Sequence, residues 1–227
     1  MLRPLNFLNS INDEPVPVLD LDIPLRRYTP INLSVNNVEL EQVSLSDPEQ
    51  CQAYIDRILQ IENAVVAYGG YLEKRNLYAD NPNFSSGVKS LRNIHLGIDF
   101  WSMAGTKVIV PADGTVHSFK NNAVKGDYGP TIILKHEVKG FHFHSLYGHL
   151  SIESLEDLNK GKKLKRGAVL GTLGTAEINV NYAPHLHFQL IISMEDKNGD
   201  YPGVCSIEDL EFYSKNCPDP NLLLHMP

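Results

Sequence analysis

The clearest periodic pattern of apolar residues begins near residue 48. Apolar and aromatic residues recur there at the i, i+3, i+4, i+7, i+8 spacing of one helix face: Cys51, Tyr54, Ile55, Ile58 and Leu59. Ser46 and Asp47 are N-cap residue types, Pro48 suits the first helical position, and Gly69-Gly70 would end a helix. The pattern predicts one amphipathic helix over residues 48–67. We interpret its apolar face as core packing rather than as a site for a partner.

From Leu91 onward the helical spacing gives way to short extended runs. Segments rich in β-branched and aromatic residues lie at 107–119, 131–135 and 141–150, and turn residues such as those at 111–114 interrupt them. Short strands separated by turns at intervals of about 8–12 residues are typical of all-β folds. We therefore expect a mainly β fold, with an antiparallel sheet or barrel-like domain rather than alternating β/α units.

Proline and polar residues dominate the first 45 residues, which predicts an extended N-terminal arm that lies on the domain or is partly disordered. Within it, the alternation of Ile31, Leu33 and Val35, followed by two asparagines, indicates a small hairpin. The expected organisation is an arm and helix at 1–85 that pack on the core, and a domain at 86–227. After Ser193 the pattern is that of a loop-like C-terminal tail, in which residues 222–224 pack back on the domain.

Composition narrows the class of protein without identifying it. The chain has 227 residues, a formal net charge of -7 and three widely spaced cysteines. A net negative charge argues against nucleic acid as the main partner, and the odd cysteine count favours reduced thiols. No apolar run approaches the roughly 20 residues of a membrane span. The start lacks the apolar run of an export signal, so a cytoplasmic location is expected unless such a signal was removed.

Two short motifs carry the candidate chemistry. In a strand, His185 and His187 share one face with Cα atoms about 7 Å apart, while the residues between and beyond them enter the core. His95 and Asp99 would lie about 13 Å apart on a straight strand, which is too far for one metal ion, so we expect a bend at Gly97. A helix would also bring the two side chains together, but Gly97 and the β-branched Ile98 disfavour it. Two imidazoles and one carboxylate leave a fourth tetrahedral position for water, as in catalytic zinc sites.

With His149 between these motifs, residues 91–192 resemble the lysostaphin-type zinc metallopeptidases, bacterial endopeptidases that mostly cut peptidoglycan cross-bridges or stems. The segments that carry the resemblance are His95-Leu-Gly-Ile-Asp99, Val110-Pro-Ala-Asp-Gly-Thr-Val116, Tyr147-Gly-His-Leu150, Gly167-Ala-Val-Leu-Gly171 and Pro184-His-Leu-His-Phe188. The resemblance implies one zinc ion held by His95, Asp99 and His187, with His149 and His185 as catalytic, non-ligand histidines. It also implies an antiparallel β fold with zinc at the floor of a groove, and a peptide or peptidoglycan substrate.

The chain departs from that family pattern in three places. Gln189 stands where these peptidases usually carry Glu, and the loop 174–182 is less rich in glycine. The tyrosine that the family often places just before the first ligand is missing from residues 91–94, and Tyr71, Tyr78 and Tyr182 are candidates to replace it. Tyr78 also forms a polar-aromatic run with Glu73 and Arg75, which we interpret as packing around the groove entrance.

The alternatives differ in substrate and in class of protein. The chain from about Tyr68 to the tail also resembles peptidase-type segments within intracellular fusions to aminotransferase-like and kinase-like enzymes, which would favour an intracellular peptide. A non-catalytic binding or regulatory module on the same fold is the main rival, and a biotinyl-type hairpin at 111–116 lacks an attachment motif. His142 and His144 form a second HxH pair that we interpret as ordinary strand. The sequence indicates neither the oligomeric state nor which of His149 and His185 is the general base.

Overall fold

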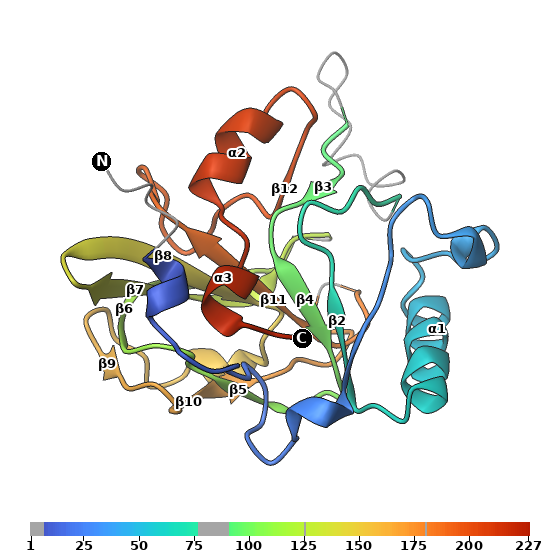
Figure 1. The fold of residues 1–227 in the computed structure, drawn as a ribbon, viewed down its shortest axis with the longest axis horizontal. Helices are drawn as coiled ribbons and strands as arrows, with labels where there is room; N and C mark the ends of the chain where they lie inside the picture. Colours follow the sequence, from blue (N-terminus) through green and yellow to red (C-terminus); the bar gives the residue numbers. More distant parts are fainter. Residues whose placement is uncertain (1–6, 77–90, 125, 180) are drawn as a thin grey trace.

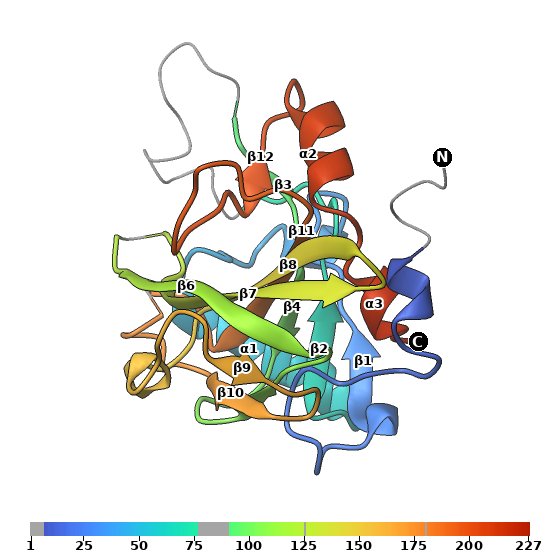
Figure 2. The same cartoon turned by 90° about the vertical axis from the view of Figure 1, so that its left-hand side faces the viewer.

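A computed structural model describes residues 7–76, 91–124, 126–179 and 181–227 of the chain. Its largest element is an eight-stranded sheet (Figures 1 and 2). In spatial order the strands are β1 (Tyr28–Pro30), β2 (Val66–Gly69), β4 (Ile98–Trp101), β11 (His185–Ile191), β8 (Phe141–Gly148), β7 (Gly129–Val138), β6 (Gly114–Asn122) and β9 (Lys163–Leu164). Two smaller sheets pair β5 (Lys107–Ile109) with β10 (Val169–Thr172) and β3 (Ile94–His95) with β12 (Val204–Cys205).

The predicted mainly β, antiparallel fold is confirmed. All neighbours in the large sheet are antiparallel except β1 and β2, which run parallel. The sheet runs from β1 at one edge to β9 at the other, so among the described strands it is open rather than a closed barrel. Within the same described residues, no helix is long and apolar enough to cross a membrane.

The central strand β11 shows why this sheet forms the core. All seven of its residues are buried, because β4 and β8 flank it and other elements cover both of its faces. On one face Leu186, Phe188 and Leu190 join the main apolar cluster of the protein. His185 and His187 occupy the opposite face, as the alternation of a strand requires, and the predicted division of this segment is confirmed.

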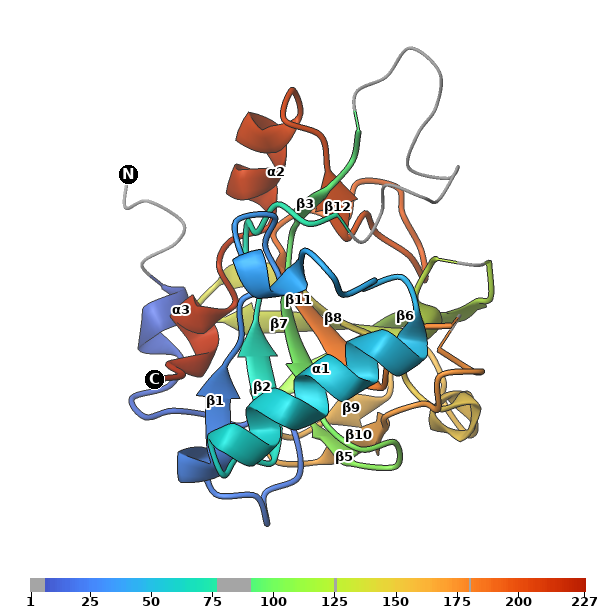
Figure 3. The ribbon, with the colours of Figure 1, turned by 90° about the vertical axis from the view of Figure 1, so that its right-hand side faces the viewer.

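The predicted amphipathic helix is α1 (Pro48–Ile61), and it crosses in front of β1 and β2 (Figure 3). The Asp47 side chain accepts hydrogen bonds from the backbone N–H groups of Glu49 and Gln50, which caps the helix. The predicted end at residue 67 is wrong. Asn63 adopts a left-handed conformation, and the N–H groups of residues 63 and 64 bond back to the carbonyls of residues 60 and 59. This Schellman arrangement ends the helix and frees Val66–Gly69 to form β2.

The N-terminal arm lies along the domain. Val18 and Leu19 are fully buried in the main core, and the Val18 carbonyl accepts a hydrogen bond from the Ile109 N–H group. The predicted hairpin at residues 31–40 is wrong, because the Asn37 side chain accepts from the Glu39 N–H group and caps a short 3-10 helix, η3 (Val38–Leu40). The predicted domain boundary at 85/86 lies outside the described residues and stays a prediction, although β1 and β2 share a sheet with later strands.

The C-terminal tail is more ordered than predicted. It forms α2 (Leu210–Asn216) and α3 (Asn221–Leu224) rather than loops, and α3 lies beside the short 3-10 helix η1 (Leu8–Ser10) (Figure 2). Leu223 and Leu224 are fully buried, which confirms that the end of the tail packs back on the domain. Two further 3-10 helices are η2 (Leu25–Arg27) and η4 (Ile152–Leu155).

Candidate active site and metal centre

The candidate residues converge where β3, β4, β8 and β11 meet. His187 on β11 lies opposite Asp99 on β4 and opposite Gly148 on β8. His149 follows β8 directly, in a left-handed conformation that turns the chain at the end of the strand. The sheet register therefore brings together residues that are about 90 positions apart in the sequence.

Gly97 produces the bend that the sequence requires. It lies between β3 and β4, which belong to different sheets, and a Cβ at this position would lie 2.6 Å from the Phe188 carbonyl oxygen and 2.8 Å from His187 Cε1. Only glycine permits so close an approach. As a result His95 Nε2 lies 3.2 Å from Asp99 Oδ1 instead of the distance that a straight strand would impose.

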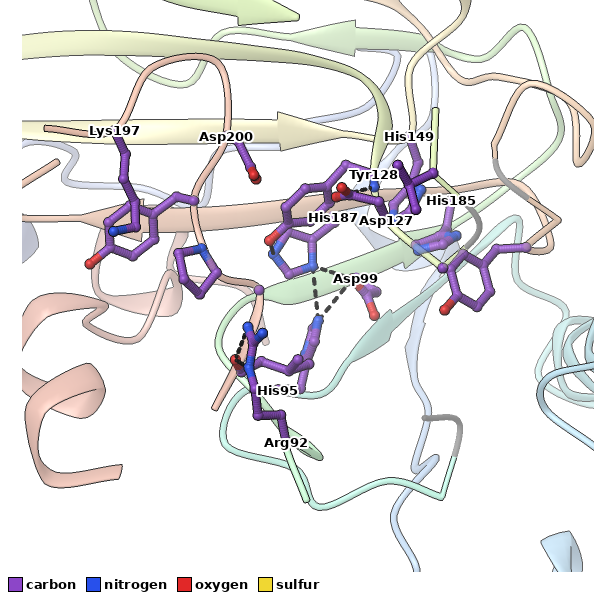
Figure 4. A pocket seen from close by; sticks show the side chains of 17 residues that line it. Arg92, His95, Asp99, Asp127, Tyr128, His149, His185, His187, Lys197 and Asp200 are labelled. Carbon is purple, nitrogen blue, oxygen red and sulfur yellow. Dashed lines mark hydrogen bonds and ion pairs between the residues drawn. The ribbon is translucent and has the colours of Figure 1, made fainter. Parts of the chain in front are cut away.

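Three donor atoms face one another at the floor of the site (Figure 4). His187 Nδ1 lies 2.9 Å from His95 Nε2 and 3.0 Å from Asp99 Oδ1. The ligands of a tetrahedral zinc ion with bonds of about 2.0–2.1 Å are about 3.3 Å apart, which is close to this spacing. All three side chains are buried.

The outward-facing ring nitrogens show which tautomers the two histidines adopt. His95 Nδ1 lies 2.9 Å from the Gly70 carbonyl oxygen and His187 Nε2 lies 2.9 Å from Gln189 Oε1. Both oxygens can only accept, so each of these nitrogens carries the proton and donates. The two inward nitrogens are then lone-pair donors that would repel each other and the carboxylate unless a cation lies among them. The donor set thus fits a metal ion.

Burial and charge keep His95 and Asp99 in the protonation states that metal binding requires. Burial lowers the pKa of His95 to about 4, with Asp99 acting in the opposite direction. For Asp99, burial favours the neutral carboxyl, but interactions with His95 and Arg75 and a hydrogen bond with His187 outweigh it, and the pKa lies well below its ordinary value. Near neutral pH, His95 is therefore uncharged and Asp99 is ionised.

His149 and His185 form the second part of the site. Their ring centroids are 4.1 Å apart, and both rings line the same pocket as the three metal-capable residues. Burial lowers the pKa of both imidazoles, and for His149 the neighbouring His185 adds to the effect. The His185 Nδ1–H group donates to the Ala183 carbonyl at 2.7 Å, which leaves Nε2 as a proton acceptor. His149 Nδ1 is buried and has no hydrogen-bond partner among the described residues.

The pocket around these groups has a volume of about 340 Å³ and is lined by charges of both signs (Figure 4). Arg92 and Lys197 contribute positive charge, and Asp127 and Asp200 contribute negative charge. A cavity of this size, with polar groups at its floor, is large enough for a few residues of a peptide.

Tyr128 and Tyr182, which both line the pocket, lie near His149. Tyr182, one of the three predicted replacements for the missing tyrosine, packs edge-on against His149 at 5.7 Å between ring centroids. Tyr71 instead donates its hydroxyl to the Cys217 carbonyl, and Tyr78 lies outside the described residues. Tyr128 was not predicted, yet its hydroxyl lies 3.5 Å from His187 Nε2. It stands in a loop where no spacing pattern could have indicated it.

The second HxH pair is ordinary strand, as predicted. His142 is exposed on β8 and lies 3.7 Å from Glu137, whereas His144 packs edge-on against His117. Within the described residues, the group able to hold a metal is His95, Asp99 and His187.

The segment that contains these residues matches a known protein family. Residues 93–199 match the model of peptidase family M23. They form an M23 peptidase domain. The resemblance seen in the sequence motifs is thus confirmed, and the three donor residues and both additional histidines fall inside this M23 domain.

Similar proteins differ from this chain in length. An uncharacterized metalloprotease of Haemophilus influenzae is 33% identical over 139 residues, which cover 58% of this chain and 27% of that protein. The peptidoglycan DD-endopeptidase ShyA of Vibrio cholerae is 33% identical over 99 residues, which cover 43% of this chain and 20% of that protein. The chain therefore spans only 20% to 27% of the length of these curated relatives.

The catalytic domain of lysostaphin from Staphylococcus simulans aligns with 59% of this chain and 94% of that domain, at 22% identity and a TM-score of 0.37. Together, the M23 match, the metalloprotease relative and the His-Asp-His group indicate a metal-dependent peptidase domain.

Proposed function

We propose that this protein is a zinc-dependent endopeptidase that cleaves peptide bonds of peptidoglycan. The observation that carries the proposal is the convergence of a His-Asp-His donor set and two further neutral histidines on one pocket. A purely structural module has no physical reason to hold five such side chains, three of them with facing lone pairs, around one point.

His95, Asp99 and His187 would hold the zinc ion, through the two inward ring nitrogens and Asp99 Oδ1. Two nitrogens and one carboxylate are a ligand set typical of catalytic zinc. When bound, zinc polarises the scissile carbonyl and lowers the pKa of water, so that a nucleophile is available at neutral pH. The fold contributes the geometry, because Gly97 and the strand register hold all three donors in place.

His185 is the group that we assign to accept a proton. Its Nδ1–H group is committed to the Ala183 carbonyl, so Nε2 carries the lone pair. A lowered pKa keeps that lone pair free at neutral pH, and a general base must be unprotonated before it acts. The same nitrogen can later return the proton to the leaving amine.

His149 has the complementary role in this scheme. It is neutral and lies beside His185, where one of its ring nitrogens can donate a hydrogen bond to the scissile carbonyl oxygen as negative charge develops there. Tyr182 packs against His149 and is a second donor in reach of the same region. Donors fixed in advance are typically worth about 10²–10³ in turnover.

Peptidoglycan is favoured as the substrate by similarity rather than by contacts. The relative from Vibrio cholerae is named a peptidoglycan DD-endopeptidase, and the M23 match covers all the site residues. The pocket carries both positive and negative side chains, which suits a peptide that has free carboxylate and amine groups. A cytosolic peptide is the second candidate substrate, because the chain from about Tyr68 to the tail also resembles peptidase-type segments within intracellular fusion enzymes.

Mass spectrometry of reaction products separates these possibilities. Purified zinc-loaded protein is incubated with a peptidoglycan digest and, in parallel, with a cytosolic peptide pool, and His149→Ala serves as the matched inactive control. Cleaved stem or cross-bridge peptides that appear with the wild type alone support the proposal. Cleavage confined to the cytosolic pool would move the substrate to the second candidate. An absence of products in both, despite bound zinc, would favour the non-catalytic module.

A further inference from the structure

The segment 69–75 lies outside the M23 match, yet it encloses one side of the metal centre. The Gly70 carbonyl accepts from His95 Nδ1, the Leu72 N–H group donates to the His95 carbonyl at 2.9 Å, and the Glu73 carbonyl accepts from the His95 N–H group at 3.0 Å. The first ligand is thus held at its ring and at both of its backbone polar groups by residues that precede the M23 domain.

Arg75 extends this contact to the second ligand. Its side chain is 1% exposed, and its Nη1 lies 2.6 Å from Asp99 Oδ2 while its Nε lies 2.6 Å from Glu73 Oε2. The other oxygen of Glu73 accepts from the Leu33 N–H group at 2.9 Å, so the N-terminal arm anchors the pair. The guanidinium also lies 5.6 Å from the centre of the Trp101 ring.

The backbone is shaped to admit this guanidinium. Gly70 has a φ of +107°, a conformation that side chains rarely adopt, and a Cβ there would overlap Arg75 Nη2. Glycine is therefore required at this turn for two reasons: the backbone has a positive φ, and the Arg75 side chain approaches closely.

This arrangement divides the two oxygens of Asp99 between two tasks. Oδ2 accepts from Arg75, whereas Oδ1 faces His95 Nε2 and His187 Nδ1. With Oδ2 held, the carboxylate cannot rotate, and it presents a single oxygen to the metal position. Glu73 offsets the charge of Arg75, so the pair orients Asp99 without adding net positive charge next to a cation.

We propose that Arg75, held by Glu73, is the positioning residue of the metal ligand Asp99, which makes the segment before the M23 domain a working part of the metal site. The inference rests on the metal site of the proposed function. It assigns to Arg75 no contact with the substrate. Its effect is transmitted through Asp99, and it should therefore be visible in metal binding itself.

The test compares metal binding by the full-length chain and by Arg75→Gln. Zinc affinity is measured by competition with a chromophoric chelator, and the absorption spectrum of the cobalt-substituted protein reports the ligand geometry. Loss of a residue that orients a ligand typically weakens metal binding by about 10- to 100-fold. We expect a loss in that range for Arg75→Gln, together with a changed cobalt spectrum. The zinc affinity of Arg75→Lys should lie between those of the wild type and Arg75→Gln, because an ammonium cannot bond both carboxylates in the same planar geometry.

A matched control comes from the helix α1. Arg57 pairs with Glu39 at 2.7 Å, but both side chains are about half exposed. Arg57→Gln therefore removes an arginine–carboxylate pair that does not line the pocket, and it should leave zinc affinity and the cobalt spectrum unchanged.

A second variant covers the case in which Arg75→Gln does not fold, since that change removes the partner of the buried Asp99 carboxylate and of the partly buried Glu73 carboxylate. Glu73→Gln preserves the ion pair between Arg75 and Asp99 but removes the negative charge that offsets the Arg75 guanidinium. Zinc affinity should therefore fall, whereas the cobalt spectrum should stay unchanged. The inference is overturned if a folded Arg75→Gln protein binds zinc at least as tightly as the wild type. If Arg75→Gln does not fold, the same result for Glu73→Gln overturns it. A wild-type protein that binds no zinc would instead overturn the proposed function.

Discussion

Acid should destabilise the metal-free protein through its buried neutral histidines. Burial lowers the pKa of His95 and of His136 from 6.5 to about 4. His136 stands outside the metal site, on β7, where its Nδ1–H group donates to the Asp113 carbonyl at 2.9 Å and its ring stacks on Phe143. Such residues remain neutral in the folded state at pH values where the unfolded chain already carries their charge.

The sign and size of the effect follow from linkage. Between pH 6.5 and about 4 the unfolded state binds more protons, so stability falls as the pH falls through this window. From about pH 7 to about pH 5, each histidine with these two pKa values lowers the free energy of unfolding by about 2 kcal/mol. Burial raises the pKa values of Asp127 and Asp219, which works in the opposite direction. The contribution of one histidine to this pH dependence is therefore measured by comparing the wild type with a variant that lacks that histidine.

The free energy of unfolding is measured by urea denaturation at about pH 7 and about pH 5, with a chelator present to keep the protein metal-free. His136→Gln removes one titrating group without changing the three residues that we propose to bind zinc. Its loss of stability between the two pH values should be smaller than that of the wild type by about 2 kcal/mol. Equal losses for the two proteins would refute the claim that His136 is held neutral by burial.

Three further predictions concern the site. His149→Ala should keep its zinc and lose turnover by at least about 10²-fold, as measured by metal analysis and peptide hydrolysis; retained turnover would remove His149 from the mechanism. Gln189→Leu should weaken zinc binding by about 10- to 100-fold, because the His187 Nε2–H group loses its acceptor at 2.9 Å; unchanged affinity in the chelator competition would contradict that role. Gly97→Val should abolish zinc binding, since a side chain there would collide with the Phe188 carbonyl and His187. Gly105→Ala has open space around it but a φ of +83°, so it should lose some stability and still bind zinc.

Local patterns predicted the parts of the site whose geometry depends on neighbours in the sequence. The alternation of His185, Leu186 and His187 fixed which side chains enter the core, and the HxxxD spacing with Gly97 required a bend that the structure contains. The start of α1 could also be predicted from local sequence, because the Asp47 side chain accepts hydrogen bonds from N–H groups only two and three residues away. The assignment of ligands and catalytic histidines within the site remains a prediction.

Features that depend on distant residues could not be predicted in this way. The end of α1 was placed too late because the strand propensity of 66–69 is realised only between β1 and β4. Arg75 was interpreted as part of a groove entrance, yet it is buried against Asp99, 24 residues further along the chain. Nothing in the spacing of Glu73 and Arg75 indicates a partner at that distance, and Tyr128 reaches His187 across 59 residues for the same reason.

The zinc content of two purified variants tests the central claim most directly. The account predicts one zinc ion per chain in the wild type and in His149→Ala, and none in His187→Ala, because His187 Nδ1 faces both other donors within 3.0 Å. A His187→Ala protein that is folded and retains a full equivalent of zinc would contradict the ligand assignment, and with it the proposed mechanism.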